Sequence, residues 1–278
     1  MTNTHIIAGY GNWGKKIALF CKKNKLFDKI IIFTRTKRFQ YFPILKKISK
    51  KELATYFLQS SSVHICSSDN SHIRLLKRFN LSNKSIIVEK PFFSNNSDYQ
   101  NTKNEFKNKN IIVNYIDLFN PHYLKVAKFL DKKHQKNSNV KILYSYSKKK
   151  NQNLFDFFES YIDHPLAIIL NLLNHFSLKR EIFIENKNTL NIQYFYSKIK
   201  INIIIKNSKL KKRLIILDDS KRKVKINFLN HHMNKSSFHN LYHYLLNKTY
   251  KNKFSLKFNK KIYKEKNSVL SNIKNQIN

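Results

Sequence analysis

All three glycines of this 278-residue chain lie within six residues, at Gly9, Gly11 and Gly14. The window follows a short apolar run and precedes residues with the apolar spacing of a helix. A G-x-G-x-x-G between a strand and a helix is typical of dinucleotide binding. The glycines allow a tight turn, close approach of the backbone to the pyrophosphate and close helix–strand packing. Free N–H groups at the helix start, near Asn12 and Trp13, would bind the pyrophosphate. A tight turn without a ligand is the alternative.

The residues after the second apolar run indicate which dinucleotide would bind. An Asp or Glu about 20 residues beyond the last glycine would hold the ribose 2′-hydroxyl of NAD. Here Thr34 stands at that distance, and Arg35 and Arg38 follow it. No carboxylate repels a phosphate, and two guanidinium groups can form paired bonds to one. The segment therefore predicts NADP, with NAD as the second choice, although basic residues are common throughout this chain.

Four further segments carry a family resemblance. Glu89-Lys90-Pro91 ends a predicted strand, and residues 65–72 resemble the motif I-A-T-P-N-x-x-H, with Ser67 in place of Thr and Ser68 in place of Pro. Residues 119–121 read F-N-P, and residues 161–166 resemble a helix that carries a catalytic histidine. Together with G-x-G-N-W-G, these segments make nearly the whole chain similar to the Gfo/Idh/MocA oxidoreductases.

This resemblance implies a reversible hydride transfer between a nicotinamide and a carbonyl or alcohol carbon, often on a sugar or cyclitol. It implies that Lys90 lies beside the nicotinamide and the substrate oxygen, with a cis bond to the following proline. An ammonium group there would stabilise negative charge on the oxygen and donate a proton. Lys90 is therefore the first catalytic candidate, and one more surface lysine is its alternative. The resemblance adds four residues to the cofactor site: Ser67, Ser68, His72 and Glu89.

His164 is the second catalytic candidate, as a proton relay. The family pattern is D-x-x-x-H, but Ser160 stands where the Asp is expected. The relay is then His164 alone, or it is completed by Tyr161, Asp163 or the substrate. This departure leaves carbonyl or imine reduction more open than polyol dehydrogenation. It also motivates a second hypothesis, a non-catalytic relative that binds the dinucleotide as a regulatory or partner-binding protein. A buried structural histidine is the alternative for His164 itself.

The elements that must position these residues change in character near residue 120. Apolar runs at 5–8, 30–33, 63–66, 85–88 and 110–113 alternate with helical patterns, which predicts a parallel sheet covered on both faces. Beyond it, an apolar helix over 161–173 precedes alternating strands over 190–196, 199–205 and 224–228, and helices follow near 238–245 and 262–277. We therefore expect a Rossmann domain over 1–119. An α+β domain over 120–278 would follow, with an open, mainly antiparallel sheet and helices on one face.

The composition bounds the partners. The formal charge is +38, but the lysines are dispersed, and the scarcity of Gly and Pro beside abundant Lys, Asn, Ile, Phe and Tyr is typical of an AT-rich genome. We therefore expect a small-molecule substrate and no specific nucleic-acid partner. With no apolar run near the roughly 18 residues of a membrane span and no room for a signal peptide, we expect a cytoplasmic protein without membrane contact.

No metal is expected. Cys21 and Cys66 fit neither a disulfide framework nor a zinc spacing. His239 and His243, with two further histidines at 231 and 232, could hold a metal, but they lack the Glu of H-E-x-x-H and the sequence suggests no third ligand. The resemblance implies a homodimer or higher homo-oligomer formed through the outer face of the second sheet. The many lysines of that face would then need counter-charges.

Overall fold

The computed structural model divides the chain into two compact units. One comprises Met1–Asn114 with Tyr242–Lys260, and the other comprises Tyr115–Leu241 with Lys261–Asn278. The boundary at 119/120 stays a prediction. The structure describes residues 3–34, 45–78, 84–102, 105–106, 111–123, 126, 138–173, 179–185, 188–196, 199–219, 222–229, 237–243 and 256–277. Within these residues, none of the helices combines the length and the apolar character needed to cross a membrane.

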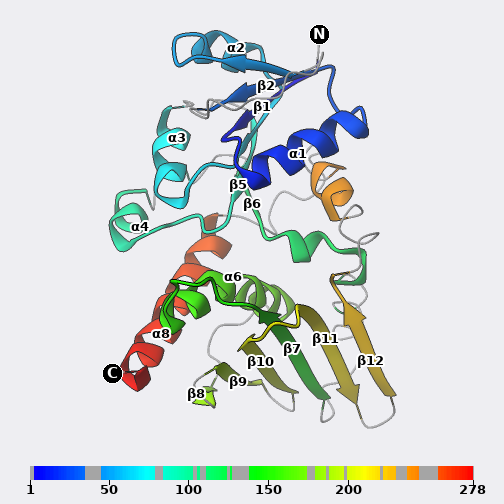
Figure 1. Ribbon diagram of the computed structural model, residues 1–278, viewed down its shortest axis with the longest axis vertical. Helices are drawn as coiled ribbons and strands as arrows, with labels where there is room; N and C mark the ends of the chain where they lie inside the picture. Colours follow the sequence, from blue (N-terminus) through cyan, green and yellow to red (C-terminus); the bar gives the residue numbers. More distant parts are fainter. Residues whose placement is uncertain are drawn as a thin grey trace. The chain divides into compact units, whose positions relative to one another are not determined.

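The first unit contains a six-stranded parallel sheet with the order β3-β2-β1-β4-β5-β6. Its strands are β1 (Thr4–Ala8), β2 (Lys29–Phe33), β3 (Leu45–Ile48), β4 (Ser62–Ile65), β5 (Ser85–Glu89) and β6 (Ile111–Asn114). The isoleucine-rich runs are fully buried because helices cover both faces. Its helices are α1 (Asn12–Lys23), α2 (Leu53–Gln59), α3 (His72–Arg78) and α4 (Asn96–Thr102). In Figure 1, α1 and α3 lie on opposite sides of the sheet. The predicted Rossmann domain is confirmed.

The strand order reverses at β1 and β4, and this reversal locates the functional edge. In open parallel sheets, ligands bind outside the carboxyl ends of the strands at such a switch point. Gly9 follows β1 and Ser67 lies just beyond β4, with Ile6 opposite Val63 in the register. The glycine window therefore lies at the switch point.

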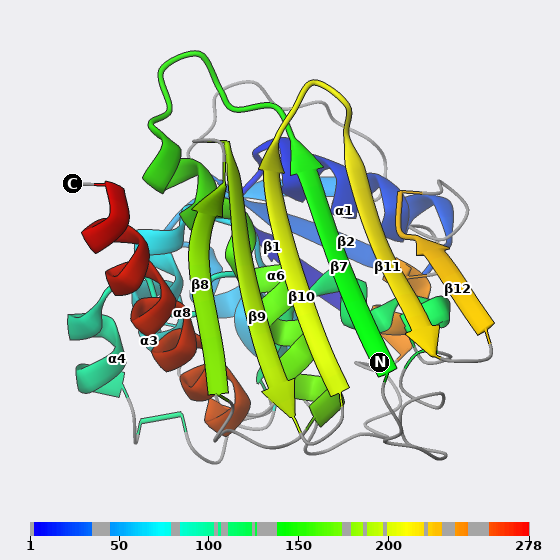
Figure 2. The ribbon, with the colours of Figure 1, turned by 90° about the horizontal axis from the view of Figure 1, so that it is seen from below.

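The second unit contains a six-stranded mixed sheet with the order β12-β11-β7-β10-β9-β8. Its strands are β7 (Ser138–Tyr146), β8 (Lys179–Glu185), β9 (Thr189–Tyr196), β10 (Ile199–Asn207), β11 (Lys212–Asp219) and β12 (Arg222–Asn227). In this second sheet β10 and β7 pair in parallel, and the other described strand pairs of the same sheet are antiparallel. Helices α6 (Leu154–Leu173) and α8 (Leu256–Ile277) cover one face, as Figure 2 shows. The open, mainly antiparallel sheet with helices on one face is also confirmed.

Apolar and polar residues alternate along β10, which explains why helices cover only one face of this sheet. Ile199, Ile201, Ile203 and Ile205 are buried, whereas Lys200 and Lys206 are exposed on the outer face. The homo-oligomer through this outer face stays a prediction.

Several elements were not foreseen from the sequence. β3, β7, β8 and β11 lie in lysine-rich stretches where alternation is hard to recognise, and β3 and β8 are edge strands with a large share of charge. α6 begins at Leu154, seven residues before the predicted start at 161. The side chain of Asn153 accepts a hydrogen bond from the backbone N–H of Asp156 at 2.7 Å, which caps the helix and explains the earlier start.

Candidate functional site

A cavity of about 640 Å³ opens at the switch point of the first unit. Five residues predicted to bind the cofactor line it: Gly9, Gly11, Thr34, Ser67 and Ser68. Sequence reasoning missed further lining residues, among them Tyr10, Lys50, Ser71, Arg74 and Arg78. Arg35 and Arg38, on which the NADP prediction largely depended, lie outside the described residues.

The three glycines have different surroundings, and two of them leave no room for a side chain. Gly9 has φ +108°, and a Cβ there would lie 2.6 Å from the backbone nitrogen of Ser67. A Cβ at Gly14 would lie 2.1 Å from the carbonyl oxygen of Gly9, so this glycine lets the first turn of α1 pack against the preceding loop. A Cβ at Gly11 would meet no protein atom within 4 Å, although Gly11 lines the cavity.

Gly11 also caps α1 without a side-chain hydrogen bond, so no side chain occupies the helix start. A helix N-terminus with open space before it suits an anion such as a pyrophosphate. These residues therefore fit a dinucleotide. Asn12, Trp13 and Gly14 form the first turn of α1 and do not line the cavity.

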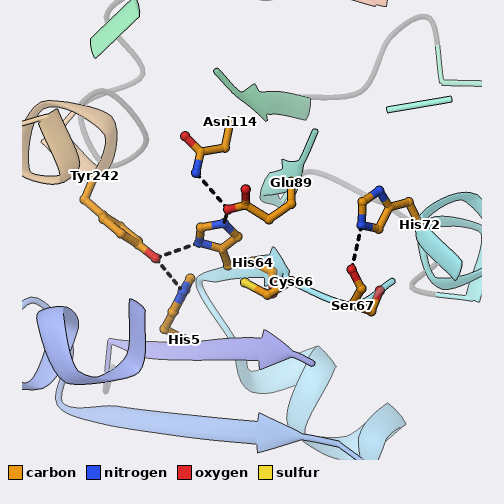
Figure 3. Close-up of polar contacts among 8 residues, drawn as sticks. All are labelled: His5, His64, Cys66, Ser67, His72, Glu89, Asn114 and Tyr242. Atoms are coloured by element: carbon orange, nitrogen blue, oxygen red, sulfur yellow. Dashed lines mark hydrogen bonds and ion pairs between the residues drawn. The ribbon is translucent and has the colours of Figure 1, made fainter. Parts of the chain in front are cut away.

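The loop after β4 presents hydroxyl groups to the cavity. The Ser71 hydroxyl lies 2.7 Å from the Ser67 hydroxyl and 2.6 Å from the Ser68 carbonyl oxygen. His72 is buried and lies behind this loop: its ring nitrogens lie 3.0 Å from the Ser67 carbonyl oxygen and 2.9 Å from the Pro91 carbonyl oxygen. Figure 3 shows His72 beside Ser67. His72 thus joins the cavity loop to the segment that follows Lys90, and it does not line the cavity itself.

Glu89 and Lys90 lie at the carboxyl end of β5. The Lys90–Pro91 bond is cis, as the resemblance predicts. The Glu89 carboxylate accepts hydrogen bonds from His64 Nε2 at 2.9 Å and from Asn114 Nδ2 at 2.7 Å. Glu89 therefore faces the neighbouring strands β4 and β6, whose side chains fix the end of the strand that carries Lys90 (Figure 3).

A buried hydrogen-bonded chain lies behind Glu89. His64 Nδ1 is 2.8 Å from the Tyr242 hydroxyl, which lies 3.4 Å from His5 Nε2, and His5 Nδ1 is 2.8 Å from the Ser62 hydroxyl. Burial, together with His64, holds the pKa of His5 well below its usual value, so His5 is neutral. Burial raises the pKa of Tyr242 well above its usual value, so its hydroxyl remains a donor. Tyr242 was not predicted, because 178 residues separate it from His64.

One group of potential metal ligands occurs among the described residues: atoms of His64, Cys66 and Glu89 lie within 4.8 Å of one another. Both His64 nitrogens already contact other groups. Burial, followed by the charge of Glu89, raises the pKa of the Cys66 thiol well above its usual value, whereas a metal needs the thiolate. This arrangement suits a hydrogen-bonded core better than a cation. His239 and His243 are exposed, and residues 231 and 232 lie outside the described part of the chain.

His164 lies in the second unit, buried within α6. The residues near it in the sequence have contacts of their own. The exposed Ser160 donates a hydrogen bond to the Asp156 carbonyl oxygen at 2.7 Å, and Asp163 pairs with Lys266 at 3.3 Å. Tyr161 stacks on Tyr146 with ring centroids 4.3 Å apart.

A carboxylate that sequence reasoning missed lies beside His164. Asp117 Oδ2, in the short 3-10 helix η2 (Ile116–Phe119), is 3.5 Å from His164 Nδ1. Burial by itself would raise the pKa of Asp117, but the charges of Arg213 and His164 and the hydroxyl of Tyr144 outweigh burial and lower that pKa. Asp117 is therefore a buried carboxylate ion. Its only signal in the sequence is that acidic residues are rare in this chain.

Solved structures share this fold over nearly the whole chain. A myo-inositol dehydrogenase from Corynebacterium glutamicum superposes with a TM-score of 0.75 at 9% identity, covering 98% of this chain and 96% of that one. The UDP-N-acetylglucosamine 3-dehydrogenase GnnA from Acidithiobacillus ferrooxidans gives 0.72 at 10% identity, with 96% of each chain covered. The WlbA dehydrogenase from Thermus thermophilus, solved with NAD and UDP-GlcNAcA, gives 0.70 at 11% identity, covering 94% of this chain and 92% of that one.

Comparison of the sequence alone finds less. No protein-family model and no curated protein matches it. The likeness therefore rests on the fold, and it extends over nearly the whole chain. The chain has the fold of oxidoreductases of the Gfo/Idh/MocA type.

Proposed function

We propose that this protein is an NADP-dependent oxidoreductase acting on a carbonyl, alcohol or imine carbon of a small polar, sugar-like substrate. The observation that carries the proposal is the cavity at the switch point, where Gly11 leaves open space before an uncapped helix start. The solved proteins with this fold include dehydrogenases of a cyclitol and of a nucleotide sugar. That supports a polyhydroxylated substrate class.

The charge of the cavity supports NADP over NAD. Among the described lining residues, Lys50, Arg74 and Arg78 are cationic and none is a carboxylate. Arg74 and Arg78 lie one turn apart on α3, and Thr34 occupies the place where an acidic residue would hold the ribose of NAD. A 2′-phosphate would meet cations and no repelling charge. We therefore propose that this cavity binds NADPH more tightly than NADH.

Side chains of this protein would stabilise the charge that develops on the substrate and would transfer its protons. When bound, the nicotinamide supplies or accepts the hydride. The Lys90 ammonium, at the end of β5, would stabilise negative charge on the substrate oxygen and give it a proton from Nζ. His164 is the second proton-carrying group, held within α6. The segment around Lys90 is fixed through Glu89 and His72, which would keep the ammonium in one place.

Nucleotide titration followed by substrate screening tests the proposal. NADPH and NADH would be titrated by fluorescence, and NADPH oxidation would then be followed over carbonyl and imine substrates. Lys90→Ala should keep NADPH binding and lower turnover about 100-fold or more, because it removes a general acid. The exposed Lys23 at the end of α1 offers the matched control Lys23→Ala, which should change neither. A wild-type protein that binds neither nucleotide would refute the proposal.

The alternative of a non-catalytic dinucleotide-binding relative rests on Ser160 in place of an Asp. The carboxylate of Asp117, 3.5 Å from His164 Nδ1, supplies a carboxylate from another segment and so supports the catalytic proposal. Tight NADPH binding without turnover on any substrate, together with no effect of Lys90→Ala, would favour the alternative.

A further inference from the structure

We propose that Asp117 is the positioning residue for His164, replacing the carboxylate that position 160 lacks, and that Arg213 and Tyr144 hold it in place. This inference rests on the proposed function, because His164 matters for catalysis only if the chain is an oxidoreductase. The geometry comes entirely from the second unit. Asp117 reaches His164 from η2, and contacts between η2 and α6 keep the two side chains together.

The Asp117 carboxylate is held on both oxygens. Arg213 Nη1 donates to Oδ1 at 2.8 Å, and the Tyr144 hydroxyl donates to Oδ2, the oxygen that faces His164 Nδ1 at 3.5 Å. Asp117 is 4% exposed, so water does not compete for these contacts. A buried carboxylate with a guanidinium on one side and a hydroxyl on the other stays ionised and keeps one orientation.

Arg213 is fixed in turn. Its Nε donates to the Tyr146 hydroxyl at 2.7 Å, and Tyr146 stacks on Tyr161 of α6 with an interplanar angle of 7°. The Tyr144 ring lies nearly parallel to the His164 imidazole, at 10° with centroids 6.3 Å apart. Residues of β7 and η2 therefore contact α6 around the turn that carries His164, and Arg213 of β11 holds two of them, Tyr146 and Asp117.

The chemical consequence concerns the two ring nitrogens of His164. The Asp117 carboxylate, 3.5 Å from Nδ1, attracts a proton to that nitrogen by its charge, and the tautomer with Nδ1–H would present Nε2 as the proton acceptor for a substrate hydroxyl. The same carboxylate stabilises the imidazolium formed in between. Asp163 and Glu159 instead lie beside Lys266, at 3.3 Å and 3.7 Å.

The experiment combines kinetics with a measurement that needs no activity. Asp117→Asn keeps the shape and removes the charge. We expect kcat to fall about 10- to 100-fold, as for other groups that orient a functional histidine, with KM and NADPH affinity nearly unchanged. In protein with ¹⁵N-labelled histidine, nitrogen chemical shifts should show Nδ1–H for wild-type His164 and a shifted tautomer in the variant. Ser160→Ala should change neither reading.

Asp117→Asn leaves Arg213 without its counter-charge and could impair folding. The double variant Asp117→Asn with Arg213→Met removes both charges, and its nitrogen shifts provide the same test. An unchanged His164 tautomer in a folded variant overturns the inference. A changed tautomer in a protein whose wild type turns over no substrate upholds the positioning by Asp117 and refutes the proposed function instead.

Discussion

Replacing each glycine of the window by alanine should separate folding from nucleotide binding. Gly11 has φ −74° and ψ −167°, a conformation open to alanine, and its Cβ would meet no protein atom within 4 Å. Gly11→Ala should therefore cost no more than about 1 kcal/mol, the range of an unfavourable N-cap residue. The midpoint of thermal unfolding should then fall by about 2–4 °C at most.

Gly14→Ala should act on the fold. Its Cβ would lie 2.1 Å from the Gly9 carbonyl oxygen, a backbone atom that cannot rotate away. Forcing a methyl group into a packed contact costs about 1–3 kcal/mol, and this contact is short enough for the upper end. Gly9→Ala adds the strain of a positive φ, about 1–3 kcal/mol, to its own contact of 2.6 Å. Both variants should unfold at least about 5 °C below the wild type.

Thermal unfolding without nucleotide, beside NADPH titration, measures both effects. Gly11→Ala should unfold near the wild type yet bind NADPH at least about tenfold more weakly, since its methyl group enters the space before the helix start. The reasoning is refuted if Gly11→Ala binds NADPH as the wild type does, because the open space would then not be the nucleotide site. It is also refuted if Gly11→Ala loses as much stability as Gly14→Ala.

Three further predictions concern the first unit. Burial holds the pKa of His5 well below 6.5, so the unfolded chain takes up the proton first. The contribution of neutral His5 to the free energy of unfolding should be fully present above about pH 6.5. Below that pH the free energy of unfolding should fall by up to about 1.4 kcal/mol per pH unit. His5→Phe should reduce this dependence in urea unfolding at pH 7.5 and 5.5, and an equal pH dependence in both proteins would contradict it. Tyr242→Phe removes the donor to His64 and should lower the unfolding free energy by about 1–3 kcal/mol, and unchanged urea unfolding would argue against that hydrogen bond. Arg74→Ala should weaken the binding of NADPH more than the binding of NADH in fluorescence titration. Equal weakening would mean that Arg74 contacts a part of the nucleotide that NADPH and NADH share.

The sequence predicts the first sheet well and the second only in part. In the first unit, buried runs such as Ile30–Ile32 are apolar throughout, because both faces of a parallel sheet are covered. In the second unit, strands such as β7 and β10 expose one face to solvent, and lysine there resembles the lysine of loops. β7 illustrates the difficulty: Lys141 is exposed between the buried Val140 and Ile142, within a stretch of high charge. Its pairing with β10 depends on tertiary contacts that no local pattern reports.

The site divides in the same way. Gly11 and Lys90 belong to contiguous motifs, so their role could be proposed from the sequence. Tyr242 and Asp117 act through partners far along the chain, His64 and His164, which only the fold brings close. From the sequence, His164 acts alone or with Tyr161, Asp163 or the substrate, and this stays a prediction; the structure adds Asp117, 3.5 Å from Nδ1. A helix offers position 160, but a neighbouring segment can supply the same group.

The scarcity of a residue type is informative beyond glycine. The chain has 16 acidic residues against 54 Lys and Arg, so an acidic side chain that folding buries needs a physical reason. Three buried or half-buried carboxylates have one: Glu89 contacts His64 and Asn114, Asp163 pairs with Lys266, and Asp117 contacts Arg213, Tyr144 and His164. All three adjoin a proposed catalytic residue: Glu89 and Asp163 directly precede Lys90 and His164, and Asp117 lies beside His164. In a chain so rich in lysine, the position of a cation says little about function, whereas the rare glycines and buried carboxylates lie where we propose that the cofactor binds and the proton transfer occurs.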